Sequence, residues 1–262
     1  GTGARRGGGC LRRLCHRDDA RRPTRLTHHS ARAASPLEAV SDLAIAFAGM
    51  SRHIGDMLIR APAILCAARA HGETAVIARL LTEEYGLVAG YVAGGRGRSL
   101  RPVVIPGNLV AVEIRARSES QLPFARLELV ESRGPWLAEP LPAAAIAWAC
   151  ALTASALPER QPYPPLYRAL AALLTAICHA PSARGWAEAL LRYEALLLRE
   201  LGYGGDRPGA LAEWTDDLAG FDRMGALIER YCLADRRGMV MATRAMLRDR
   251  LARIAGQPSP ER

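Results

Sequence analysis

Apolar and polar residues alternate over short runs between positions 63 and 133, and glycine- or proline-containing turns separate the runs. In the clearest run, 109–117, one face is apolar and the other charged: Val110, Val112, Ile114 and Ala116 against Glu113, Arg115 and Arg117. A period of two is typical of a half-buried strand. The run 124–130 repeats the pattern, with Leu127 and Leu129 inward and Arg126 and Glu128 outward.

The strands expected from this pattern are 64–70, 75–82, 87–93, 109–117 and 124–130. Several short strands within about 70 residues, separated by turns, predict a small closed β-barrel such as an OB-fold.

After Pro135 the apolar period lengthens to that of helices. The expected helices are 141–157, 163–180, 183–201, 222–233 and 239–255. Ser182 and Asp222 are the predicted N-caps of the third and fourth, and Gly202 is the predicted C-cap of the third. The fold class is therefore α+β: an OB-fold barrel domain (57–134) followed by an all-helical C-terminal domain (135–256) and a tail (257–262).

The first 56 residues differ from the rest, because they hold ten arginines against five acidic residues and show little apolar periodicity before Leu37. We expect a disordered or non-native extension, with Met57 as the natural start of translation. A transit-like or nucleic-acid-binding arm is the alternative.

The formal net charge is +9, and every basic residue is arginine, because the chain contains no lysine. Such an excess favours polyanionic partners. Uniform use of arginine is also typical of a GC-rich coding bias, so a single arginine does not by itself indicate a phosphate contact. No apolar run has the length of a membrane span, and we expect no membrane partner.

The candidate binding residues lie in the glycine-rich loop 94–101, which carries Arg96, Arg98 and Arg101. Glycines let a backbone approach phosphate closely, and arginines donate charge-assisted hydrogen bonds to it. If this loop folds over the next strand, Arg115 and Arg117 join the same DNA-binding surface. The alternative is a solvated, mobile loop.

Two further features qualify this hypothesis. Arg244 and Arg248, neighbours on the last expected helix, could extend the DNA path, although such a face is more often merely solvated. Base stacking looks weak, because Tyr91 and Phe124 fit a core position equally well. We therefore expect phosphate contacts with little sequence preference.

Nothing in the sequence indicates catalysis, a metal site or a cofactor. His71 and His179 lack a partner at the spacing of a triad or a metal site. Adjacent Glu83 and Glu84 would point to opposite faces of a strand. The six cysteines (10, 15, 66, 150, 178 and 232) contain no C-x-x-C pair, and four of them are expected to be buried free thiols, which suits a reducing cytoplasm.

Three segments in order resemble the bacterial RecO family of DNA repair and recombination mediators. The first combines a GET turn at 72–74, LTEEYGLV at 81–88 and the Gly-Gly-Arg-x-Arg loop. The second is LRYEALLLRELGYG at 191–204, and the third is IERYCLADRRGMVMATRAML at 228–247. The resemblance covers roughly residues 57–254.

The resemblance implies an N-terminal OB-fold, a helical C-terminal domain and a place in the cytoplasm at the nucleoid. It also implies binding of single- and double-stranded DNA, annealing of complementary strands, and loading of RecA with RecR onto strands coated by single-strand-binding protein (SSB), whose C-terminal tail would be a partner. Some family members hold zinc with four cysteines after the LGYG segment. This chain has no cysteine between Cys178 and Cys232, so zinc is not expected.

Three other functions stay open at this point. The chain could be an OB-fold RNA-binding protein, a non-catalytic adaptor without affinity for nucleic acid, or an enzyme that acts on nucleotides through its helices.

Overall fold

A computed structural model describes residues 57–116, 122–203, 218–234 and 237–255. All of these residues lie within residues 36–262, which form one unit of the chain. The expectations for 1–56, for Arg117 and for the 257–262 tail fall outside the described residues.

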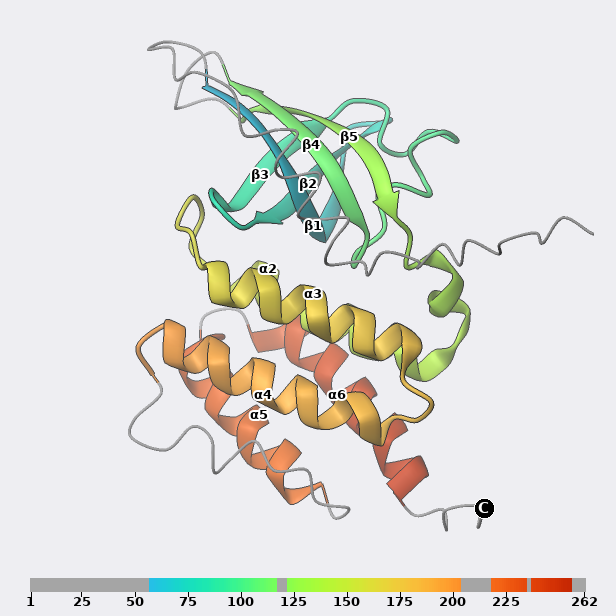
Figure 1. Ribbon diagram of the computed structural model, residues 1–262, viewed down its shortest axis with the longest axis vertical. Helices are drawn as coiled ribbons and strands as arrows, with labels where there is room; N and C mark the ends of the chain where they lie inside the picture. The colour runs from blue at the N-terminus through green and yellow to red at the C-terminus, as the bar shows by residue number, and fades with distance from the viewer. Residues whose placement is uncertain (1–56, 117–121, 204–217, 235–236, 256–262) are drawn as a thin grey trace, which may run out of the picture. The chain divides into compact units, whose positions relative to one another are not determined.

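The first half of the described chain forms a closed barrel (Figure 1). Its strands are β1 (Met57–His71), β2 (Ala75–Thr82), β3 (Gly86–Val92), β4 (Leu109–Ala116) and β5 (Phe124–Glu131), in the order β1-β2-β3-β5-β4. Neighbours pair antiparallel except β3 and β5, which pair parallel at one position and close the barrel. The predicted OB-fold barrel is confirmed.

The strand β1 is longer than its predicted range of 64–70. Its first half pairs with β4 and its second half with β2. The pairing with β4 is a long-range contact that no local apolar pattern reveals, and it extends the strand back to Met57.

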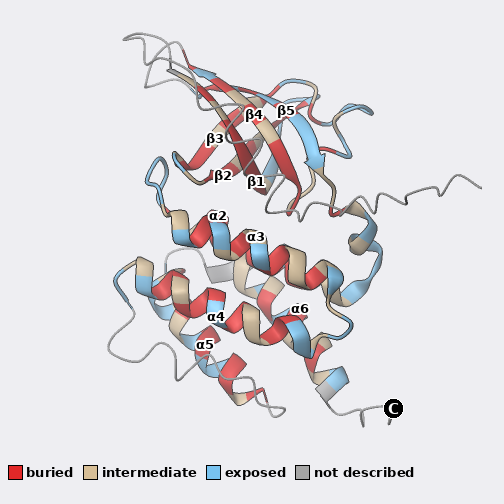
Figure 2. Cartoon of the chain, viewed as in Figure 1, coloured by how far each residue is buried: buried red, intermediate tan, exposed pale blue. Residues whose placement is uncertain are grey.

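Side chains alternate along the strands as predicted, with one exception. Val110, Val112 and Ile114 of β4 are buried in the barrel, whereas Arg115 is exposed. Leu129 was expected to point inward but is 41% exposed. The reason is that β5 pairs with β3 only at Phe124, so the second half of β5 is an open edge, drawn as exposed in Figure 2.

The second half of the chain is helical. A short 3-10 helix, η1 (Gly134–Ala138), leads into α2 (Pro140–Ala156), α3 (Pro164–His179), α4 (Arg184–Glu200), α5 (Ala219–Tyr231) and α6 (Arg237–Ala255). These bounds lie within a few residues of the predicted ones. The helical C-terminal region is therefore confirmed.

The capping predictions have mixed outcomes. Gly202 ends α4 as predicted, with φ at +85° and the Tyr203 N–H donating to the Leu198 carbonyl. Ser182 does not cap this helix, because Ala183 occupies the N-cap position and no side chain caps it. Asp222 is likewise not an N-cap, since it lies inside the first turn of α5.

The hydrophobic core consists of two clusters. One fills the barrel interior. The other joins the helices to the outer side of the barrel, where β1 contacts α2. This cluster includes Ile64 of β1, Leu81 of β2 and Leu87 of β3. Because this cluster crosses position 134, the barrel and helices share one apolar interface; their division into separate domains stays a prediction.

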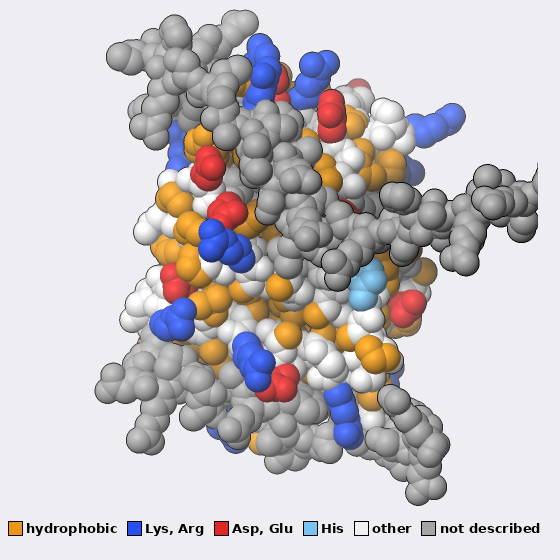
Figure 3. All heavy atoms as spheres, viewed as in Figure 1, with side chains coloured by type: hydrophobic (Ala, Val, Ile, Leu, Met, Phe, Trp, Pro, Cys, Tyr) orange, Lys and Arg blue, Asp and Glu red, His pale blue; other side chains and the backbone are white. Residues whose placement is uncertain are grey.

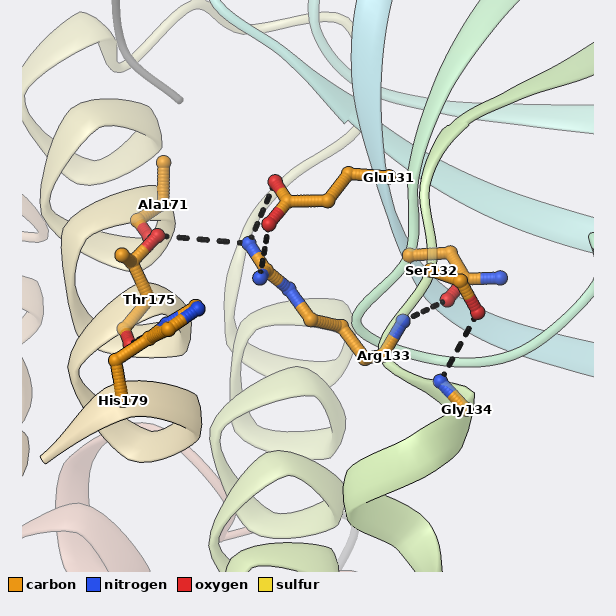
Figure 4. A network of polar contacts seen from close by, with 8 residues as sticks. Glu131, Ser132, Arg133, Gly134, Ala171, Thr175 and His179 are labelled. Carbon is orange, nitrogen blue, oxygen red and sulfur yellow. Dashed lines mark hydrogen bonds and ion pairs between the residues drawn. The ribbon is translucent and has the colours of Figure 1, made fainter. Parts of the chain in front are cut away.

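A polar network marks the passage from β5 to the helices (Figure 4). The guanidinium of Arg133 donates to both carboxylate oxygens of Glu131 and, at 3.5 Å, to the hydroxyl of Thr175 on α3. Its backbone N–H donates to the Asn108 side chain at 2.7 Å. Arg133 is buried, so these contacts compensate a charge removed from water and orient the barrel on α3.

Candidate nucleic-acid interface

The arginine loop, residues 93–108, has a defined backbone. Gly94 adopts a φ of +66°, and the Gly97 N–H donates to its carbonyl at 2.8 Å. The Arg101 N–H in turn donates to the Gly97 carbonyl at 2.9 Å. Gly95 lies so close to Val76 that an added Cβ would stand 2.6 Å from a methyl carbon of that valine. The glycines therefore seat the loop against β2.

Arg96 fastens this loop to the turn between β1 and β2. Its guanidinium donates to the carbonyls of Gly72 and Glu73 at 3.4 and 3.0 Å, and its backbone N–H donates to the Thr74 carbonyl at 2.9 Å. The sequence predicts a phosphate contact for Arg96; in the structure this side chain is exposed, and its guanidinium also holds the two loops together.

Arg98 and Arg101 are exposed on the same loop. Neither side chain has a hydrogen bond or ion pair within the described part of the chain. Their guanidinium groups are therefore available to an anionic ligand. In Figure 3 arginine side chains project from the barrel at the top of the view.

Asn108 holds the far end of the arginine loop, and sequence reasoning missed it. Its buried amide donates to the carbonyls of Pro102 and Val103 at 2.9 and 3.0 Å, and its oxygen accepts the Arg133 N–H. A Pro-Gly-Asn turn directly before a strand was the available signal, because asparagine side chains often bond nearby backbone groups in turns.

A groove of about 560 Å³ separates the arginine loop from β4 and β5. Ala93 and Leu100 line it from the loop side, and Arg115, Phe124 and Arg126 line it from the strands. The loop therefore borders the groove that Arg115 also lines.

The cross-strand register places two arginines and two aromatic rings in one outward row. The paired positions are Arg69↔Ile77, Ile77↔Tyr91, Tyr91↔Phe124 and Phe124↔Arg115. Directly opposed residues share a face of a sheet. Phe124 is 65% exposed and Tyr91 is half-buried. The sequence left core and surface positions open for these two residues, and Phe124 takes the surface position.

The alternation along 124–130 already predicts that Phe124 faces outward. Ala125 and Leu127 are buried, so Phe124 belongs to the opposite, outward phase of β5 together with Arg126. An aromatic residue in an outward phase was the signal for a surface ring.

The carboxylate of Glu113 lies between two arginines of the same barrel face, Arg60 and Arg115. Glu113 accepts a hydrogen bond from Arg60 and another from Arg115, each at 2.7 Å. The hydrogen bond from Arg60, and then that from Arg115, lowers the pKa of Glu113. The carboxylate therefore stays charged near neutral pH and offsets part of the local positive potential.

Arg244 and Arg248, the candidate residues on α6, both form ion pairs within the protein. Arg244 is buried and forms an ion pair with Glu194 at 3.0 Å, so it cannot reach a phosphate on the surface. Arg248 is partly exposed, but its guanidinium donates to both carboxylate oxygens of Asp222. The α6 surface is therefore a weaker candidate than the barrel.

Other features of the described residues that bear on function are their free thiols, their capacity to hold a metal ion and the length and polarity of their helices. Cys66, Cys150, Cys178 and Cys232 are free, and burial raises the pKa of Cys66 to about 12 and that of Cys232 to about 11. Such thiols are poor nucleophiles near neutral pH. In the described ranges no group of three or more His, Cys, Asp or Glu side chains could hold a metal ion, so the donor set of a zinc site is not found there. Within the same ranges no helix is both long and apolar enough to cross a bilayer.

Comparison with known proteins points to one family. The family description "Recombination protein O N terminal" matches residues 57–133, and "Recombination protein O C terminal" matches residues 140–206. The DNA repair protein RecO of Rhodospirillum centenum is 46% identical over 145 residues, which cover 55% of this chain and 56% of that protein.

Two further relatives agree. The DNA repair protein RecO of Phenylobacterium zucineum is 42% identical over 158 residues, 60% of this chain and 64% of that protein. The protein of the same name from Gluconacetobacter diazotrophicus is 41% identical over 149 residues, 56% of this chain and 59% of that protein. In each case the matched part spans less than two thirds of the relative.

Proposed function

The chain belongs to the RecO family of DNA repair proteins, and from this premise we propose that it binds DNA through the outer face of its barrel. The observation that carries the proposal is the position of Arg98 and Arg101. Both are exposed without side-chain partners among the described residues, on a loop that borders the groove lined by Arg115. Arg96, Arg115 and Arg117 are proposed to contribute, and Arg248 to contribute less.

Phosphate contacts account for this binding. A guanidinium donates several hydrogen bonds in a planar fork that suits phosphate oxygens. Contacts to the sugar–phosphate backbone of DNA carry no sequence information, so the binding is expected to be sequence-tolerant. Positive charge between two strands also screens their mutual repulsion. Annealing of complementary strands follows as the proposed activity, and it needs no catalytic step.

The family relationship extends the proposal to partners. We propose that the protein cooperates with RecR in loading RecA onto single strands covered by SSB, and that it recognises the acidic, aromatic-ended C-terminal tail of SSB. A receptor for such a tail needs an apolar groove rimmed by arginine. Binding of both single- and double-stranded DNA, at the nucleoid, belongs to the same proposal.

Salt dependence tests the DNA contact. Neutralising about three to five phosphates of a single strand gives a slope of log K against log salt near −2 to −3.5. The double variant Arg98→Gln, Arg101→Gln should make the slope shallower by up to about 1.4. Arg192→Gln on α4, where the arginine is paired with Glu188, is the matched control and should leave the slope unchanged. A flat salt response of the unmodified protein would overturn the proposal.

The RNA-binding alternative is tested with the same probes. Affinity for a single-stranded DNA oligonucleotide is compared with affinity for RNA of matched sequence, and annealing of complementary DNA strands is followed with and without SSB. Tighter binding to RNA, together with no acceleration of DNA annealing, would favour the alternative.

A further inference from the structure

We propose that Phe124 is a stacking ring for an unpaired base of single-stranded DNA, so that the barrel binds single strands more tightly than duplex. The inference rests on the proposed DNA-binding function and adds a second kind of contact to it. Phe124 has the largest exposed fraction, 65%, of the large hydrophobic side chains in the described ranges.

The ring of Phe124 is held in place rather than loose on the surface. Tyr91 contacts it in an edge-to-face arrangement, with ring centroids 5.3 Å apart and an interplanar angle of 76°. His71 contacts Tyr91 in the same manner at 5.9 Å. Edge-to-face contacts between rings are favourable, so the series His71–Tyr91–Phe124 orients the exposed ring before any ligand arrives.

The backbone explains why these rings meet. The Tyr91 N–H donates to the Pro123 carbonyl at 2.7 Å, which is part of the short parallel pairing of β3 and β5. Gly90 and Ala125 approach so closely that a Cβ on Gly90 would lie 2.6 Å from that of Ala125. A glycine at position 90 is therefore needed to bring Tyr91 beside Phe124.

Charge on both sides of the rings fits a nucleotide chain. Arg115 lies directly opposite Phe124 in the register, and its side chain is 66% exposed. Arg69 lies at the other end of the row, exposed and without a side-chain partner among the described residues. A base on Phe124 would thus carry its phosphates past guanidinium groups. Aromatic rings between basic groups are how proteins bind single strands without reading sequence.

Duplex DNA cannot use the same ring. Its bases are stacked on one another and paired, so their faces are not available to a side chain. Duplex retains only the phosphate contacts. Annealing converts single strands, which make both stacking and phosphate contacts, into a duplex, which makes phosphate contacts alone. The weaker binding of the duplex favours its release.

Variants at position 124 separate stacking from charge. Full-length protein is titrated with a labelled single strand of about 16 nucleotides and with the corresponding duplex. Phe124→Ala is expected to weaken single-strand binding by about 5- to 100-fold while leaving the salt slope and the duplex affinity nearly unchanged. Phe124→Trp should preserve single-strand binding. Leu129→Ala, which truncates another exposed apolar side chain of β5, is the matched control.

An abasic single strand provides the decisive comparison. Removal of the bases from the probe should weaken binding by the unmodified protein and have little effect on Phe124→Ala. Equal weakening of single-strand and duplex binding by Phe124→Ala, or unchanged single-strand binding, would overturn the inference. The proposed function fails separately, if the unmodified protein shows no salt-dependent DNA binding at all.

Discussion

The guanidinium of Arg244 and the carboxylate of Glu194 form an ion pair of 3.0 Å in which the two side chains are 5% and 0% exposed. Glu194 also accepts a hydrogen bond from the Trp148 indole at 2.6 Å, and Arg244 donates to the Phe221 carbonyl at 2.8 Å. The guanidinium further lies 3.7 Å from the centroid of the Phe221 ring. This pair connects α2, α4, α5 and α6, so Arg244 serves the helical fold.

Breaking this buried pair should destabilise the protein strongly. Glu194→Gln leaves the buried Arg244 charge without its carboxylate partner, and we expect a loss of about 3–5 kcal/mol in the free energy of unfolding, measured with urea. Glu188→Gln removes the exposed partner of Arg192 and should cost less than about 1 kcal/mol. Equal losses in the two variants would contradict the structural role assigned to Glu194.

Asn108 should determine the order of the arginine loop. Asn108→Ala leaves the carbonyls of Pro102 and Val103 and the N–H of Arg133 without this side chain as a partner. We expect a loss of about 1–3 kcal/mol in the free energy of unfolding, because the buried N–H of Arg133 is left without its acceptor.

The same variant should expose the loop to protease. Trypsin is expected to cleave after Arg96 and Arg98, which precede Gly97 and Ser99, faster in Asn108→Ala than in the unmodified protein, as mass spectrometry would show. Glu194→Gln, destabilised elsewhere, is the control for general unfolding. If trypsin cuts both variants at these two arginines equally fast, Asn108 does not specifically stabilise the loop.

Removal of the carboxylate at position 113 should tighten DNA binding. Arg60 holds the pKa of Glu113 below its usual range, so the group is charged at neutral pH and opposes a polyanion. Glu113→Gln is expected to raise the affinity for single-stranded DNA by about 2- to 5-fold at low salt, an effect that salt screens.

The direction of the shift also constrains the pH profile. Because the pKa of Glu113 is lowered, its protonation begins only below the range usual for a glutamate. Affinity between about pH 6 and pH 8 should therefore be the same function of pH in Glu113→Gln as in the unmodified protein. A step in this interval that the variant abolishes would contradict the assignment.

Gly86 and Gly72 offer a matched pair of backbone substitutions. Both have positive φ, +68° and +61°, and alanine should cost about 1–2 kcal/mol at either for that reason. At Gly86 an added Cβ would also lie 2.0 Å from the Gln161 carbonyl oxygen, whereas Gly72 has open space. Gly86→Ala should therefore lose a further ~1–3 kcal/mol in urea unfolding. Equal losses of stability in the two variants would show that the backbone at Gln161 moves away from an added Cβ at position 86 without cost.

The sequence alone determined the order and type of the strands and α-helices, but not the short 3-10 helix η1. The alternation in 109–117 predicts β4 and its buried face, and Gly202 predicts the end of α4. These features depend on the period of burial along one element and on the φ of one residue, both of which are local properties. The arginine loop was found in the same way, from its glycines and charges.

Tertiary structure decided which of these residues are available to a ligand. Arg98 and Arg244 are both candidate phosphate contacts in the sequence, but Arg244 forms an ion pair with Glu194, 50 positions away, and is buried, whereas Arg98 is exposed. Phe124 becomes an oriented surface ring only because β3 and β5 pair at Tyr91. Burial and exposure of a single side chain depend on contacts between distant segments, and the pattern of one segment carries no information about its partner.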